Sequence, residues 1–327
     1  MAKKSRTEEA VAQLGELGKR TLTEEDIEYI RASIANPNRL IVGKAAKVVA
    51  EKHLREFAPE LTRAFARFME DPADTDKGCY AKLAILETLV KLEADAIDVF
   101  RRGVRHVQRE PVFGGYHDTA APLRAICAMA LARQEVPDVF FELVALLADP
   151  EPQARAGAVR ALTYMNEERA ELLLRLKVLV RDREPAVLSE CFAGLMSISA
   201  GRSLPLVASF LDSQDILIAE GAALALGESR SPAALDALLK HREAAADRET
   251  RTMLLLPIAL SRSDVSFDYL LKVVAQDHSE SAAAAVRALK IYAADDALHQ
   301  RIHDAVAGRG DSTVSRAYES TFPKGTQ

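Results

Sequence analysis

Apolar residues recur along most of the chain with the spacing of one helix face, in pairs of segments separated by short polar turns. The clearest pair is VFFELVALLAD followed by PEPQARAGAVRAL, and the two meet at Asp149. Counting from Asp149, small or apolar residues fall nine, twelve and thirteen positions later, and these three positions share one face of an α-helix. The pattern therefore predicts a helix, a short turn and a second helix that buries this face.

The same template recurs about every 34 residues, which is a spacing typical of helical-hairpin repeats. Its turns are anchored at Asn36, Asp76, Asp118, Asp149, Asp182, Ser213, Asp247 and Gln276. The recurrence predicts an all-α fold, an α-solenoid of about eight helical hairpins. The small residues nine positions after the anchors, Cys127 and Cys191 among them, are expected to pack neighbouring helices closely.

The two ends of the chain differ from this array. Residues 1–22 are polar, and we expect a tail or a frayed helix there. Thr23 followed by Asp26 resembles a capping box that opens the first repeat helix. We assign residues 23–307 to the repeat array and residues 308–327 to a capping helix and tail, because a solenoid must cover its open core at each end.

Composition and charge narrow the classes of partner. The chain has 327 residues and a formal net charge of −5, so neither nucleic acid nor an anionic membrane is expected as the main partner. Residues 1–110 carry 20 Lys and Arg against 19 Asp and Glu, and the remainder carries 23 against 29. The longest uncharged apolar run, MLLLPIAL, is too short to span a bilayer. We expect a cytoplasmic protein without a membrane segment, structural metal or cofactor.

The stretch D-P-x-x-x-x-R-x-x-A-x-x-A-L at Asp149 resembles HEAT repeats, in particular the short bacterial kind first described in phycobilin lyases. The resemblance covers roughly residues 24–307. It implies a solenoid whose second helices line the concave side, and a hydrogen-bonded ladder between each turn Asp and a basic residue six positions later. Three pairs match the ladder: Asp76/Lys82, Asp118/Arg124 and Asp149/Arg155. In the other repeats that position holds Val42, Leu188, Ala219, Met253 and Ala282.

The stretch EPVFGGYHD, residues 110–118, interrupts the third repeat as an insertion in its turn. One hypothesis is an anion site, because Gly114 and Gly115 can expose successive N–H groups near a helix start, with His117 beside them. A metal held by His106, Glu110, His117 and Asp118, or acid–base chemistry at His117, are further hypotheses. The favoured interpretation is a structural turn, with Phe113 and Tyr116 tucked onto neighbouring helices.

A basic stripe precedes this insertion. Arg101, Arg105 and Arg109 lie four residues apart, which places them on one face of a helix expected at residues 95–109. Such a stripe is a candidate phosphate grip, although a charged row on an outer helix is more often a solvated face.

Apolar residues on the face of the second helices opposite the core form the candidate partner surface. It comprises Met129, Met196, Leu224, Leu254 and Ile258. Because no catalytic motif is present, we expect a non-enzymatic scaffold that binds another protein or peptide there. Two alternatives remain: a bilin lyase-like subunit, and a nucleic-acid-binding protein that uses the basic stripe. Burial of the apolar row by close helix packing, or a register shift caused by Pro257, would remove the groove.

Overall fold

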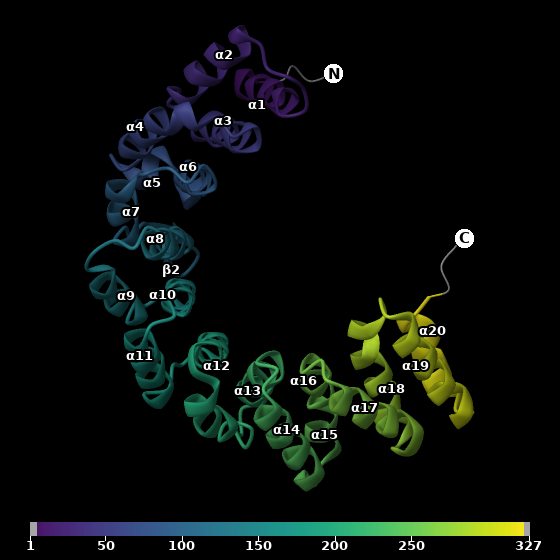
Figure 1. Ribbon diagram of the computed structural model, residues 1–327. Helices are drawn as coiled ribbons and strands as arrows, with labels where there is room; N and C mark the ends of the chain where they lie inside the picture. The colour runs from purple at the N-terminus through teal and green to yellow at the C-terminus, as the bar shows by residue number, and fades with distance from the viewer. Residues whose placement is uncertain (1–4, 324–327) are drawn as a thin grey trace. The chain divides into compact units, whose positions relative to one another are not determined.

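The computed structural model describes residues 5–323, almost entirely as α-helices joined by short turns (Figure 1). The outermost residues of the two predicted end segments, 1–4 and 324–327, lie outside the described part. The chain divides into two compact units, Met1–Met165 and Asn166–Gln327, called unit 1 and unit 2. The all-α prediction is confirmed, whereas the division after Met165 was not predicted.

Unit 1 contains four helical hairpins preceded by one helix. Its elements are α1 (Arg6–Leu17), α2 (Glu24–Ile34), α3 (Arg39–Lys52), η1 (Arg55–Phe57), α4 (Ala58–Phe68), α5 (Pro72–Thr75), η2 (Lys77–Cys79), α6 (Tyr80–Lys91), α7 (Ile97–Val104), β1 (Arg109–Val112), β2 (Gly115–Asp118), α8 (Ala121–Arg133), α9 (Val139–Leu147) and α10 (Pro152–Met165). The second helices α3, α6, α8 and α10 pack side by side, and the first helices cover them from the other side. Helix α1 has a complete capping box at Ser5 and buries Leu14 and Leu17 against α3, so the polar N-terminal segment includes a packed helix.

Unit 2 continues the same arrangement. Its elements are α11 (Glu168–Leu179), α12 (Pro185–Ala208), α13 (Ile216–Glu228), α14 (Pro232–Ala244), α15 (Arg248–Met253), α16 (Leu255–Leu260), α17 (Asp264–Gln276), α18 (Ser279–Ala288), η3 (Leu289–Tyr292), α19 (Asp296–Arg309) and α20 (Ser312–Thr321). Here α12, α13, α16, α18 and α20 form the layer of second helices. Helices α19 and α20 pair as a further hairpin across the turn at Gly310, which has a φ of 67°.

The predicted repeat template is confirmed at most positions. Seven of the eight residues nine positions after an anchor are completely buried, from Ala45 in α3 to Ala285 in α18. The exception is Leu256, which is 44% exposed. In that repeat the second helix is broken between α15 and α16, and the buried residues are instead Leu255, Ile258 and Ala259. The break therefore shifts the buried face of this repeat by one residue.

Helix α12 is the one helix in residues 5–323 whose length and apolar composition would suffice to cross a membrane. Its backbone leaves the helical region at Ser199, where φ is −154° and ψ is 73°. Helix α12 packs against both α11 and α13, and its part after Ser199 also contacts α11, because Arg202 pairs with Glu171 at 2.5 Å. The apolar character of α12 is thus explained by packing against two neighbouring helices.

Ion pairs at the turns of unit 1 include two of the three ladder pairs that the resemblance implied, and Arg155 donates to the backbone carbonyl oxygen of Asp149 at 2.9 Å. Lys82, whose side chain is fully buried, lies 3.2 Å from Asp76. Arg124 donates from Nη1 to Asp118 at 2.7 Å and from Nη2 to Asp149 of the next repeat at 2.8 Å. Burial alone raises the pKa of Asp118, but N–H donors of Gln108 and Ala120 together with Arg124 outweigh it and lower that pKa. The ladder therefore connects two consecutive repeats through one buried guanidinium group.

Candidate functional site

The predicted apolar row does not form a continuous exposed surface. Met129 and Leu224 are half-buried, so part of each side chain is accessible to a partner. Met196 is only 3% exposed, and Leu254 and Ile258 are completely buried. The prediction that these three residues face a partner groove is therefore wrong.

Leu254 and Ile258 are buried for a different reason from Met196. Leu254 and Ile258 enter the core because of the register shift at the break between α15 and α16, which Pro257 accompanies. Met196 lies fourteen positions after its anchor, directly beside the buried position of Leu195. Since α12 packs against helices on two sides, its buried face is wide enough to include Met196.

The predicted anion-binding residues are not brought together. Helix α7 ends at Val104, so Arg109 lies in strand β1 and shares no helix face with Arg101. Arg101 donates to the carbonyl oxygen of Pro137 at 3.2 Å, and Arg105 forms a bidentate pair with Glu142 of α9. These two side chains hold α7 to the next hairpin rather than form a phosphate grip.

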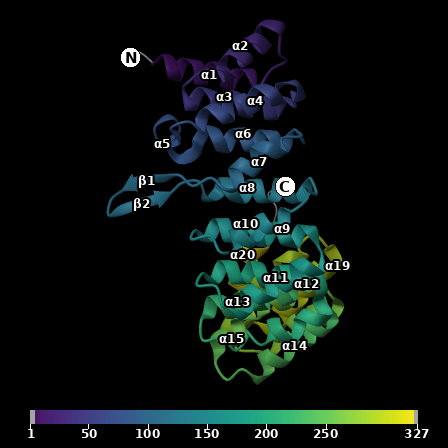
Figure 2. The same ribbon diagram turned by 90° about the vertical axis from the view of Figure 1, so that its left-hand side faces the viewer.

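The insertion is a two-stranded antiparallel hairpin, which the prediction of a turn missed. Figure 2 shows it extending away from the helices of unit 1. Gly114 and Gly115 lie at its tip, Phe113 is fully exposed and Tyr116 is 74% exposed, so the prediction that these aromatic residues tuck onto helices is wrong. His117 is exposed on β2, and its neighbour Asp118 is buried, because successive strand residues face opposite ways.

The base of this hairpin is fixed by hydrogen bonds to Glu110 and Asp118, two of the residues that the metal hypothesis would need as ligands. Glu110 accepts hydrogen bonds from Gly78 N at 2.6 Å, Gln108 Nε2 at 2.6 Å and Thr119 Oγ1 at 2.9 Å. Asp118 is similarly engaged by Gln108 N and Arg124. Within residues 5–323 no group of three His, Cys, Asp or Glu side chains converges as a metal site. The polar residues of the insertion therefore anchor a hairpin.

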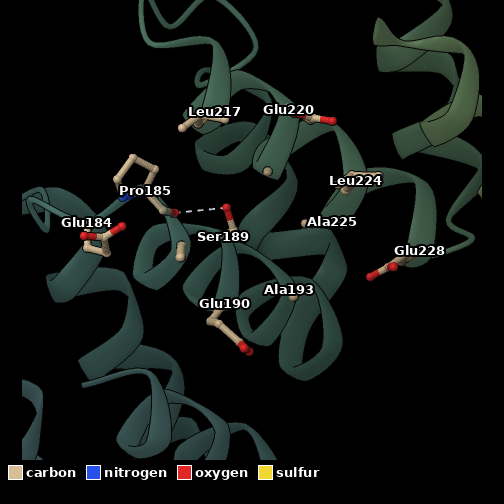
Figure 3. Close-up of a pocket in the computed structure, with 12 residues that line it drawn as sticks. Glu184, Pro185, Ser189, Glu190, Ala193, Leu217, Glu220, Leu224, Ala225 and Glu228 are labelled. Carbon is tan, nitrogen blue, oxygen red and sulfur yellow. Dashed lines mark hydrogen bonds between the residues drawn. The ribbon is translucent and has the colours of Figure 1, made fainter. Parts of the chain in front are cut away.

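A groove of about 520 Å³ between α12 and α13 is the strongest candidate for a binding site (Figure 3). Its floor is formed by small and apolar residues, including Ala193, Ala225 and Leu224. Leu217, at the first turn of α13, is 57% exposed at the edge of this floor. The groove thus presents an uncovered apolar surface on the second-helix face of unit 2.

The two helices meet so closely because residue 221 is glycine. A Cβ atom on Gly221 would lie 2.0 Å from Ser189 Oγ and 2.9 Å from Ser189 Cβ. Ser189 turns its hydroxyl to the carbonyl oxygen of Pro185, one turn earlier, at 3.0 Å (Figure 3). Small residues at the seam therefore let the backbones approach, and the larger side chains on either side form the walls.

Four carboxylates line the groove: Glu184 and Glu190 beside α12, and Glu220 and Glu228 on α13 (Figure 3). Among the described residues, Glu184, Glu220 and Glu228 form no ion pair. None of the twelve described residues that line the groove is Lys, Arg or His. Three of the four carboxylates, Glu184, Glu220 and Glu228, therefore carry negative charge beside an apolar floor without a cation paired to them among the described residues.

Sequence reasoning found only one residue of this site, Leu224. The missed signal was available, since Glu220 lies seven positions after its anchor, on the helix face predicted to be free, and Glu190 lies next to that position in the preceding repeat. Counting charge across neighbouring repeats at these positions would have identified an acidic surface.

The three cysteines are buried and are not activated as nucleophiles. Burial raises the pKa of the Cys79 thiol to about 11 and that of Cys191 to about 12, and it also raises the pKa of Cys127. Since the thiolate is the nucleophile, these side chains act as packing residues.

A comparison with known protein families agrees with this repeat architecture. A family model of HEAT repeats matches residues 172–256, which include the whole groove between α12 and α13. No curated protein matches the sequence. One similar solved structure is the complex of CpcE and CpcF of phycocyanin lyase from Nostoc sp. PCC7120. It shares 16% identity, with 89% of this chain and 96% of that chain covered and a TM-score of 0.38. An engineered protein shares 17% identity over 97% of this chain and 99% of that chain, with a TM-score of 0.37. From the family match we conclude that residues 172–256 are similar to HEAT repeats, and the helical hairpins on either side have the same helix–turn–helix form.

Proposed function

We propose that this protein is a non-enzymatic scaffold that binds a segment of another protein in the groove between α12 and α13. HEAT repeats are typical of protein-interaction scaffolds, and their second helices present extended surfaces for partners. The observation that carries the proposal is the uncovered apolar floor, in which Leu217 is exposed and Leu224 is half-buried. Exposed apolar side chains gathered beside a polar rim are characteristic of interaction sites.

The buried thiols support a scaffold rather than a thiol-dependent catalyst. Cys79, Cys127 and Cys191 form no disulfides. This state is usual in a reducing compartment, which supports our proposal that the binding takes place in the cytoplasm.

The nucleic-acid alternative loses its main support. Arg105 is paired with Glu142 and Arg101 is bound to the backbone at Pro137, so the basic stripe is occupied within unit 1. The bilin lyase alternative rests on likeness of fold, which assigns no chemistry to this chain.

Site-specific photocrosslinking tests the proposed function. A photoreactive amino acid at position 217 should capture a defined protein in the native host, and one at Val265 of α17, which is 62% exposed, should not. With the photoreactive residue kept at position 217, Leu224→Glu should abolish the capture while the melting temperature changes by no more than a few degrees, because Leu224 lines the groove and is only half-buried. Equal capture at positions 217 and 265, or capture that survives Leu224→Glu, would contradict the groove.

A further inference from the structure

We infer that the segment bound between α12 and α13 is a cationic peptide, whose apolar residues face the floor and whose Lys or Arg side chains lie on both flanks. The inference rests on the proposed function and adds the chemistry of the partner. It follows from the placement of charge in the groove, since acidic side chains stand on both walls.

The walls select the sign of charge, because Glu184 on one side and Glu220 and Glu228 on the other form no ion pair among the described residues, and the lining contributes no basic residue. Unit 2 as a whole is also acidic, with 19 Lys and Arg against 23 Asp and Glu in residues 166–327. An acidic peptide, a nucleic acid or an anionic membrane would bring like charges together at this rim. Such juxtaposition disfavours binding and gives specificity against the wrong partner.

The spacing of the carboxylates suits a short segment. Glu220 and Glu228 lie eight residues apart on α13, which corresponds to about 12 Å along the helix axis. About eight residues of a bound helix, or about four residues of an extended strand, cover this distance. Cationic residues spaced by two helical turns would therefore meet both carboxylates of one wall.

A groove in unit 1 provides an internal contrast. It lies at the ends of α6 and α8, and its lining combines Glu87 and Glu93 with Lys91 and Arg133. Mixed charges of this kind do not select a single sign. The preference for a cationic partner is therefore a property of the α12–α13 groove and not of every gap between repeats.

Three synthetic peptides of about 14 residues test the inference, each with leucines at the spacing of one helix face and with Lys, Glu or Gln at the flanking positions. Binding to the full chain is measured by fluorescence anisotropy. We expect the Lys peptide to bind more tightly than the Gln peptide, and the Glu peptide not to bind. The preference should weaken between about 0.05 M and 0.5 M salt, because screening shortens the reach of rim charges.

The matched variants separate the rim from the net charge. Glu220→Lys/Glu228→Lys should weaken the Lys peptide about tenfold and strengthen the Glu peptide. Glu243→Lys/Glu319→Lys changes the net charge equally at exposed, unpaired positions outside the groove, and it should leave both affinities nearly unchanged. Equal weakening by both pairs, or no preference for the Lys peptide, would overturn the inference. The rim variant should fold, since both of its side chains are exposed and Lys is favourable at the end of α13.

Failure of this inference can be distinguished from failure of the proposed function. A protein that crosslinks at position 217 but contacts the rim through neutral or acidic residues would retain the scaffold and exclude the cationic partner. Absence of any crosslink at position 217 would instead reject the groove itself.

Discussion

Units 1 and 2 carry different side chains at the repeat position six residues after the turn. In unit 1, Lys82 and Arg124 lie six residues after a turn Asp and are buried in ion pairs. In unit 2 the equivalent positions hold Leu188 and Ala219, and the cation comes from a first helix instead, as Lys177 pairs with Asp182 at 2.7 Å. The comparison shows that the cation paired with a turn Asp can come from either helix of the repeat.

This difference affects what remains available at the surface. Unit 1 uses Glu110 and Asp118 to anchor its hairpin and Glu142 to hold α7. In unit 2, Glu220 and Glu228 are left unpaired along the groove. These three acidic residues of unit 1 therefore join elements within the unit, whereas Glu220 and Glu228 of unit 2 remain available to a partner.

Breaking the ladder should give the largest effect. Arg124→Met leaves Asp118 and Asp149 without their shared cation in a buried setting, and removal of one partner from a buried pair costs about 3–5 kcal/mol. Hydrogen exchange should show the loss of protection in residues 1–165, and urea unfolding should show the lower stability. The control is Arg301→Met in unit 2, whose pair with Asp268 is exposed and should contribute at most about 1 kcal/mol. Similar losses for the two variants would contradict the burial argument.

A close backbone contact in unit 2 should give the next largest effect. A Cβ atom on Gly227 would lie 2.1 Å from the carbonyl oxygen of Pro257, so Gly227→Ala forces α13 and α16 apart and should cost about 1–3 kcal/mol. Gly308→Ala in α19 meets no atom within 4 Å and should stabilise the helix by up to about 1 kcal/mol. Thermal unfolding of both variants checks the opposite signs. A stable Gly227→Ala protein would show that the two helices can separate freely.

The contribution of the Asp118–Arg124 pair to the free energy of unfolding should depend on pH, with a smaller effect than the two substitutions above. Because the pKa of Asp118 is lowered in the folded protein, its contribution is present above its ordinary value of 3.8 and is lost as pH falls through the folded pKa. In Arg124→Met, protonation instead relieves a buried carboxylate that has lost its cation. The stability difference between wild type and Arg124→Met should therefore narrow between pH 5 and pH 3, roughly the range over which such carboxylates titrate, as measured by urea unfolding. A constant difference would show that Asp118 does not contribute through its charge.

The smallest effect is expected at the tip of the hairpin in unit 1. Phe113 is fully exposed, so Phe113→Ser should change the stability by less than about 0.5 kcal/mol. Differential scanning calorimetry measures this directly, with Phe100→Ser in the buried face of α7 as the destabilising control. A large loss from Phe113→Ser would mean that the tip packs onto the helices after all.

The repeats were predictable because helix periodicity is local, whereas the site depended on contacts between repeats. Positions such as Ala158 and Leu162 could be placed in the core from spacing alone, since every helical hairpin must bury one face. The end of α7 at Val104 could not be predicted from spacing, because the hairpin that follows is held by Gln108. The side-chain amide of Gln108 donates a hydrogen bond to the backbone carbonyl oxygen of Asp76 in the preceding repeat. The burial of Ile258 likewise depends on where a helix breaks, and spacing does not locate such breaks.

The approach of α12 to α13 at Gly221 and Ser189 also bears on how the binding preference of this chain can change. The separation of the walls depends on residues at the seam, whereas the charges of Glu220 and Glu228 are carried by exposed side chains that leave the seam untouched. Mutations at the rim can therefore accumulate without disturbing the scaffold. A library randomised at positions 184, 220, 224 and 228 on an unchanged backbone should yield grooves of altered charge preference, and a single exchange at Gly221 should eliminate most of its members.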